Sequence, residues 1–140
     1  MDREVIFRGK RLDNGQWLYG DLMFDNHQGC YIYPNDCTGL YTENEVDSHT
    51  VGQFTGLRDK RGRKIYEGDV VEVYDFTSVY ASKYRGIVKM CCGSWCVEYE
   101  DSILDMVAHP RLFFDDFADR KTEVIGNIYD NPELLDNESK

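Results

Sequence analysis

Short apolar stretches, separated by polar turns that contain glycine, recur along most of the chain. Aromatic and β-branched residues concentrate in these stretches, which is the composition typical of strands. The expected strands are residues 4–7, 16–24, 31–33, 69–74, 85–91, 95–99 and 123–128. Residues 85–91 and 95–99 are expected to pair as a hairpin. Many short strands joined by tight turns favour an all-β fold, barrel-like and with SH3-like elements.

Helix signals are scarce by comparison. Asn131 precedes Pro132, which is typical of an N-cap followed by a first-turn proline. This pair predicts a short C-terminal helix at about 132–136. Residues 102–119 fit either irregular or helical structure, and residues 75–84 fit either a loop or an extension of a strand.

The segment 54–73 echoes the segment 7–23. Both contain Phe-x-Gly, a polar turn with glycine, an apolar residue, tyrosine, and then Gly-Asp before an apolar pair. Chance is the alternative explanation, because turns reuse glycine and aspartate for their backbone dihedrals. We interpret the echo as two pseudo-repeated β units, about 7–54 and 54–128. We expect the units to pack as a single domain over residues 1–140.

Each unit is expected to start with a hairpin, and its Gly-Asp pair is expected to mark a second turn. In this interpretation Gly56, Gly62 and Gly68 serve backbone geometry, and Tyr66 is a core residue.

The amino-acid composition and the net charge limit the classes of function that this protein can have. The chain has 140 residues, of which 41% are hydrophobic and 14% aromatic, so it is expected to fold. Its net charge of -10 repels nucleic acid at long range, which makes a nucleic-acid partner unlikely on this ground. No apolar run approaches the roughly 20 residues that span a bilayer, and the start of the chain lacks the apolar region of a signal peptide. We therefore expect a cytoplasmic protein with no membrane partner.

Cysteines are the strongest candidates for chemistry. Five are present, an odd number that fits reduced thiols better than a disulfide framework. Cys92 and Cys96 have a spacing that zinc ligands use, and Cys91 is adjacent. The alternative, which we favour, is that Cys91, Cys92 and Cys96 are small core or surface residues of a hairpin. No motif of an enzyme or a cofactor site is present, so we expect no catalytic, cofactor-binding or metal-binding residues.

One basic cluster stands out in this acidic chain. It consists of Arg58, Lys60, Arg61, Arg63 and Lys64. The cluster fits a solvated hairpin tip, a contact for acidic residues such as 43–47 of another subunit, or a contact for nucleic-acid phosphate. These residues are the predicted interaction site.

Several motifs carry a resemblance to a known family. They are the segment GQFTGL at 52–57, Asp59, Gly62, IYEGDVV at 65–71, the opening 7–10, and EVIGNIYDNPELL at 123–135. The chain resembles the YopX family of phage and prophage proteins over most of its length. The resemblance implies a phage-derived accessory protein in a bacterial host cell, homo-oligomeric, with no established activity and no known catalytic residues.

Two functions of different classes follow from these observations. The first is a non-enzymatic accessory protein that acts through protein–protein contacts, with itself and with host or phage proteins. The alternative is an SH3-like module that binds nucleic acid through the basic turn at 58–64. A metal-dependent or cysteine enzyme is the least favoured.

Overall fold

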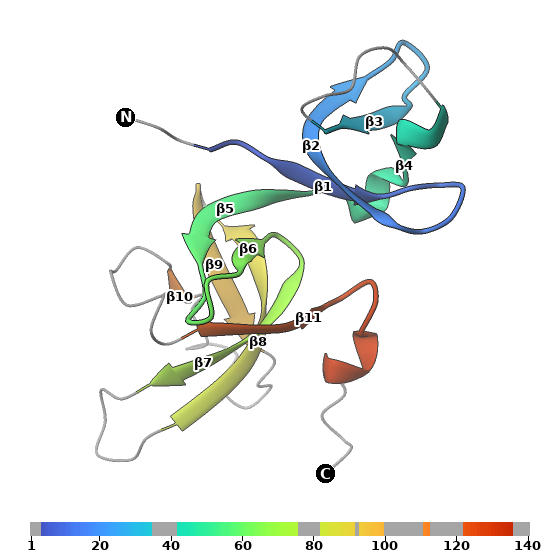
Figure 1. Ribbon diagram of the computed structural model, residues 1–140. Helices are drawn as coiled ribbons and strands as arrows, with labels where there is room; N and C mark the ends of the chain where they lie inside the picture. The colour runs from blue at the N-terminus through green and yellow to red at the C-terminus, as the bar shows by residue number, and fades with distance from the viewer. Residues whose placement is uncertain are drawn as a thin grey trace. The chain divides into compact units, whose positions relative to one another are not determined.

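The computed structural model describes residues 4–34, 42–75, 82–91, 93–99, 111–112 and 122–135. The chain divides into two compact units, unit 1 (Met1–Gly56) and unit 2 (Leu57–Lys140) (Figure 1). The strands are β1 (Phe7–Lys10), β2 (Trp17–Phe24), β3 (Cys30–Tyr33), β4 (Glu45–Val46), β5 (Gly52–Arg58), β6 (Lys64–Tyr66), β7 (Asp69–Asp75), β8 (Ser82–Cys91), β9 (Ser94–Tyr99), β10 (Arg111–Leu112) and β11 (Thr122–Asn127). Short 3-10 turns are η1 (Thr42–Asn44), η2 (Ser48–Thr50) and η4 (Pro132–Leu135).

Unit 1 is an antiparallel sheet with the strand order β4-β3-β2-β1-β5. Alternation along its strands sends one set of side chains to a small core. The buried members of this core are Cys30, Ile32 and Val46, with Phe7, Leu18, Leu22 and Val51 packed against them.

Strand β1 begins later than the sequence predicts. The expectation of a strand at 4–7 is wrong, because β1 spans Phe7–Lys10. Charged Arg8 and Lys10 alternate there with Phe7 and Gly9, so the segment lacks a recognisable apolar run. Gly9 is needed for packing, since a Cβ atom at this position would lie 3.0 Å from Cγ2 of Val46.

Unit 2 contains a five-stranded antiparallel sheet with the order β10-β9-β8-β7-β11. The predicted β8–β9 hairpin is confirmed, with Val88 opposite Val97. Both valines belong to a second core, whose buried members are Ile65, Val71, Val88 and Val97 and whose half-buried neighbours are Leu57, Val73, Trp95 and Val124.

The two echoing segments fold differently at their Gly-Asp pairs. In unit 2, Glu67 and Gly68 form a turn that separates β6 from β7, and Gly68 has a φ of 91°. In unit 1 the expected second turn is wrong, because Gly20 and Asp21 lie inside the continuous strand β2. The second segment has one additional residue, Glu67, and this residue lies within the turn. The duplication itself, and the single domain, stay predictions.

The expected geometric role of three glycines is supported. Gly56, Gly62 and Gly68 have φ angles of 91°, 84° and 91°, in the region that favours glycine. Tyr66 is buried, as expected of a core residue.

The fold class is confirmed at its coarser level. The protein is mostly β-sheet in antiparallel arrangement, with very little helix, and neither sheet closes into a barrel in the described ranges. The expected C-terminal helix is a single 3-10 turn, η4, because so short a segment cannot repay the cost of helix nucleation. Strand extension is partly right for 75–84, since β7 ends at Asp75 and β8 begins at Ser82. The rest of that segment, and all of 102–119 except β10, lie outside the described residues.

Candidate interaction surface

The basic cluster lies on and around a loop built by one buried aspartate. Asp59 accepts hydrogen bonds through Oδ1 from the backbone N–H groups of Arg61 (2.9 Å) and Arg63 (2.8 Å). Its own N–H donates to the Arg63 carbonyl at 2.8 Å. Gly62 occupies the position with positive φ. The sequence 59–63 thus folds into a closed loop because a short acceptor begins it and a glycine permits its sharpest bend.

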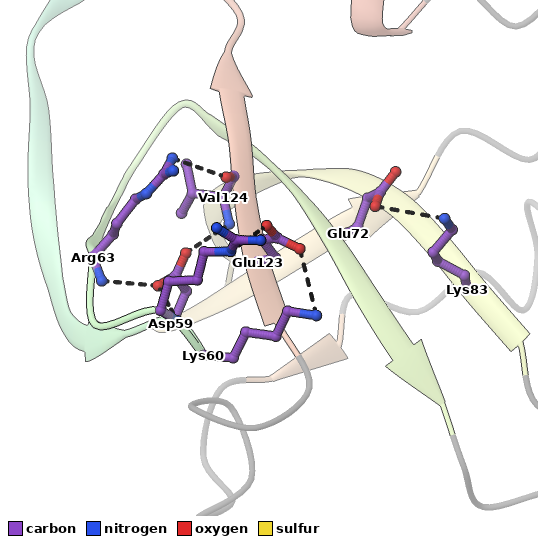
Figure 2. A network of polar contacts seen from close by, with 8 residues as sticks. Asp59, Lys60, Arg63, Glu72, Lys83, Glu123 and Val124 are labelled. Atoms are coloured by element: carbon purple, nitrogen blue, oxygen red, sulfur yellow. Dashed lines mark hydrogen bonds and ion pairs between the residues drawn. The ribbon is translucent and has the colours of Figure 1, made fainter.

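This loop is fastened to strand β11 of the same unit. Oδ2 of Asp59 accepts a hydrogen bond from the N–H of Val124 at 2.9 Å, and the N–H of Lys60 donates to the Thr122 carbonyl at 2.9 Å. Arg63 donates from its guanidinium to the Val124 carbonyl at 3.3 Å. Figure 2 shows Asp59 and Arg63 beside Val124. The loop is therefore an anchored part of the sheet.

Two glutamates lie opposite each other on the outer face of this sheet. Glu123 of β11 faces Glu72 of β7 across the strands. Like charges in directly opposite positions repel, so such a pair needs compensation. Glu123 binds Lys60 at 3.5 Å and Arg61 at 2.9 Å. This carboxylate is in contact with both a lysine and an arginine.

Strand β8 supplies the second pair of cations. Lys83 lies 3.7 Å and Arg85 2.9 Å from the carboxylate of Glu72. Figure 2 shows Lys83 extended toward Glu72 and Lys60 toward Glu123. Tyr74 completes the surface, with the ammonium of Lys60 at 4.4 Å and that of Lys83 at 5.8 Å from its ring centroid.

We call this surface the charged face: Lys60, Arg61, Glu72, Tyr74, Lys83, Arg85 and Glu123. Four cations against two carboxylates leave it a net charge of +2, in a chain whose net charge is -10. The carboxylates are recessed, with side chains 13% and 18% exposed, whereas the cations are 34–63% exposed. The charged face therefore presents positive charge to solvent.

The five predicted interaction residues have three different roles in the structure. Lys60 and Arg61 belong to the charged face. Arg58 donates to the Gly62 carbonyl at 2.9 Å, and Arg63 binds the backbone of β11, so both brace the loop. Lys64 lies half-buried in β6.

Sequence reasoning missed the other two cations of the face. Lys83 and Arg85 are two positions apart on β8, which places them on one side of a strand. The alternation of side chains along a strand could therefore have predicted that Lys83 and Arg85 lie on the same side. Their position beside Glu72 depends on the β7–β8 register, which the sequence pattern does not give.

Unit 1 presents a surface of a different kind at the end of β2. Met23 is 48% and Phe24 66% exposed. A tight loop follows, in which Asp25 accepts N–H hydrogen bonds from His27 and Gly29 and a 3.1 Å hydrogen bond from the Tyr31 hydroxyl. The N–H groups of Gly29 and His27 lower the pKa of Asp25, and the bond to Asp25 raises the pKa of Tyr31.

Acidic side chains surround this end of unit 1. The register Met23–Tyr31–Glu45 places these three residues in one row across β2, β3 and β4. Burial raises the pKa of the Cys30 thiol, and the charges of Asp25, Glu45 and Asp47 raise it further. We call Met23, Asp25, Glu45 and Asp47 the acidic end of unit 1.

The cysteines depart from the expectation of reduced thiols at one position. Cys30 is a buried free thiol, whereas Cys96 is disulfide-bonded. No group of three or more metal-ligating side chains occurs within the described residues. The thiol of Cys91 and all of Cys92 lie outside the described residues.

Comparison with known proteins places the chain in a family. The sequence model of the YopX family, described as YopX protein, matches residues 6–136. The chain belongs to the YopX family. A YopX match over this range confirms the resemblance that the GQFTGL and GNIYDNPELL motifs carry, and it leaves the activity open.

One solved structure is similar over nearly the whole chain. It is the crystal structure of protein EF1440 from Enterococcus faecalis, with a TM-score of 0.58 and 22% sequence identity, covering 96% of this chain and 99% of that one. At this sequence identity, the structural similarity is evidence for the fold alone. No curated protein matches the chain significantly. Among the described residues, no helix is long and apolar enough to cross a membrane.

Proposed function

We propose that this YopX-family protein is a non-enzymatic accessory protein that acts through protein–protein contacts, self-association included. Family membership supports an origin in a phage or prophage and a place of action in the bacterial cytoplasm. The observation that carries the proposal is the concentration of exposed apolar side chains in unit 1.

The exposed large hydrophobic residues are unevenly distributed. Six such residues occur in the described part of the chain, and five of them lie in unit 1: Val5, Leu12, Tyr19, Met23 and Phe24. Met23 and Phe24 are neighbours at the end of β2, where the hydrogen-bonded Asp25 loop holds the strand end in place. Burying a methionine or phenylalanine side chain stabilises a contact by about 1.5–3 kcal/mol when burial is complete. Met23 and Phe24 are 48% and 66% exposed and lie on opposite faces of β2, so a partner that covers one of them gains the part of this energy that corresponds to its exposed fraction.

Sedimentation equilibrium with a matched pair of variants tests this proposal. Met23→Asn and Met90→Asn place the same uncharged polar side chain at methionines of nearly equal exposure, 48% and 47%, on strands of unit 1 and unit 2. We expect the wild type to self-associate and Met23→Asn to weaken association about tenfold, equivalent to about 1.4 kcal/mol. Met90→Asn should behave as the wild type does. A wild type that stays monomeric at every accessible concentration, or equal effects of the two variants, contradicts the proposal.

Nucleic-acid binding by an SH3-like module is the second candidate. The exposed cations of the charged face favour it, since phosphate contacts supply most of the affinity of such proteins. Retention of single- and double-stranded oligonucleotides at low salt by the wild type, and its loss in Lys60→Met, would support this function. Absence of retention at low salt would exclude it.

A further inference from the structure

The charged face has the features of a receptor for an acidic protein surface. Its cations are more exposed than the two carboxylates that they bind, and Arg85 also donates to the Leu134 carbonyl at 3.1 Å. The glutamates hold each lysine and arginine in place, so fewer side-chain rotamers are lost when a partner binds. Because the charged face has a net charge of +2, it attracts a partner surface that carries two or three carboxylates.

The acidic end of unit 1 offers a matching surface. Asp25 accepts a hydrogen bond from the Tyr31 hydroxyl at 3.1 Å, and Tyr31 lies opposite Glu45 in the β3–β4 pairing, so these two carboxylates lie on one face of the sheet. Asp47 follows two residues after Glu45, where it caps η2. Met23 shares a row with Glu45, which places apolar surface among these charges. A contact between the two surfaces combines opposite charges at its edge with apolar burial.

We propose that the charged face of unit 2 binds the acidic end of unit 1 of a second copy of this chain. This inference rests on the proposed self-association and specifies its two surfaces. Each copy carries one surface of each kind, so the contact is heterologous, joining two different patches.

A protein surface fits the charged face better than nucleic acid does. Proteins that bind single strands without sequence preference stack bases on exposed aromatic rings. The ring of Tyr74 already has Lys60 and Lys83 against it, at 4.4 and 5.8 Å. Glu72 and Glu123 also neutralise half of the positive charge, which weakens a contact that depends on phosphates alone.

Lysine-to-methionine variants of the charged face test the inference, because each removes one positive charge while the neighbouring ion pair of the glutamate with its arginine remains. Lys83→Met removes one positive charge, and Glu72 keeps Arg85 at 2.9 Å. Lys89→Met is the matched control, because Lys89 lies on the same face of β8, is also paired with a glutamate, Glu98, and has nearly the same exposure, 48% against 54%. Both variants change the net charge equally, so any general repulsion between copies changes equally.

We expect Lys83→Met to raise the dissociation constant for self-association about fivefold and Lys89→Met to leave it unchanged. The double variant Lys60→Met/Lys83→Met, in which each glutamate keeps its arginine, should raise it about tenfold or more. These differences should shrink at 1 M salt, where the screening length falls to about 3 Å. Thermal melting of each variant checks that the fold is retained.

A double-mutant cycle identifies the surface on the other copy. Glu45→Gln removes a charge from the acidic end of unit 1. If the two surfaces meet, Glu45→Gln has a smaller effect in the Lys83→Met background than in the wild type, since neighbouring partners are not additive. Fully additive effects would overturn the pairing.

The outcomes separate the failure of this inference from that of the proposed function. A wild type that stays monomeric contradicts both the proposed self-association and this inference. A wild type that associates, with Lys83→Met and Lys89→Met behaving alike, overturns only the inference. If Lys83→Met associates as the wild type does but no longer retains single-stranded oligonucleotides, the charged face binds nucleic acid and the inference is wrong.

Discussion

Two loops of the protein have the same hydrogen-bond pattern and different roles. In each, an aspartate Oδ1 accepts the N–H groups two and four residues later: Asp25 at 2.8 and 2.7 Å, Asp59 at 2.9 and 2.8 Å. In each, the aspartate N–H donates to the carbonyl four residues on, at 3.0 and 2.8 Å. The third residue after the aspartate, Gln28 or Gly62, has positive φ in both.

The second carboxylate oxygen distinguishes the loops. In Asp25 it accepts from the Tyr31 hydroxyl, six residues away, so the loop of unit 1 is stabilised locally. In Asp59 it accepts from the N–H of Val124, 65 residues away, and the carboxylate is buried. One local conformation therefore closes a turn in unit 1 and fastens two distant segments together in unit 2.

Alanine at the two aspartates should give the largest contrast. Asp59→Ala removes the buried carboxylate that accepts from three partly buried N–H groups, and we expect it to lower the free energy of unfolding by about 2–4 kcal/mol. Asp25→Ala should cause a clearly smaller loss, because water can replace the carboxylate at the exposed loop. Urea unfolding of both variants measures the difference.

An asparagine variant shows which bond matters at Asp59. Asp59→Asn retains an oxygen that can accept from the N–H groups of Arg61 and Arg63. Its amide NH₂ group, however, then faces the N–H of Val124, and two donors cannot form a hydrogen bond. We expect most of the destabilisation of the alanine variant to remain. An Asp59→Asn protein as stable as the wild type would mean that the bond to Val124 contributes little.

Exchanging the residues with positive φ should have intermediate effects of opposite sign. Gly62→Ala should destabilise the protein by about 1–2 kcal/mol, since a Cβ atom is strained in this conformation. No atom lies within 4 Å of that Cβ position, so strain is the whole effect. Gln28→Gly relieves the same strain and should stabilise unit 1 by up to about 1 kcal/mol, less the added flexibility of the unfolded chain.

Thermal melting of the two variants measures both shifts. A shift of the same sign in both would contradict the equivalence of the loops.

The sequence predicts these loops unequally. The Asp59 loop contains glycine at its bend, and its geometric role follows from the sequence. The Asp25 loop places Gln28 at the equivalent position, so no glycine indicates its conformation. Local patterns also predict the β8–β9 hairpin, because its two strands alternate around a short turn.

The charged face could be predicted only in part. Lys60 and Arg61 are conspicuous in the sequence, whereas Glu72, Arg85 and Glu123 are brought together by strand pairing between distant segments. The sequence also makes Arg58 and Arg63 equal candidates for binding. The Arg58 guanidinium binds the Gly62 carbonyl within the loop, whereas that of Arg63 binds the Val124 carbonyl, 61 residues away, a contact that only tertiary structure determines.

Acidification tests the local loop with the smallest expected effect. The N–H groups of Gly29 and His27 hold the pKa of Asp25 below its ordinary value of about 3.9, since they bind the charged form. A carboxyl whose folded pKa is lowered stabilises the protein above the unfolded pKa, and this contribution is lost as pH falls through the folded pKa. The melting temperature of Asp25→Asn should therefore lie slightly below that of the wild type at pH 6, and the gap should close below about pH 4. NMR titration of the Asp25 carboxyl measures the cause directly: a pKa at or above 3.9 would show that its two N–H bonds do not favour the charged form, and the loop of unit 1 would then owe its shape to Tyr31 and the backbone.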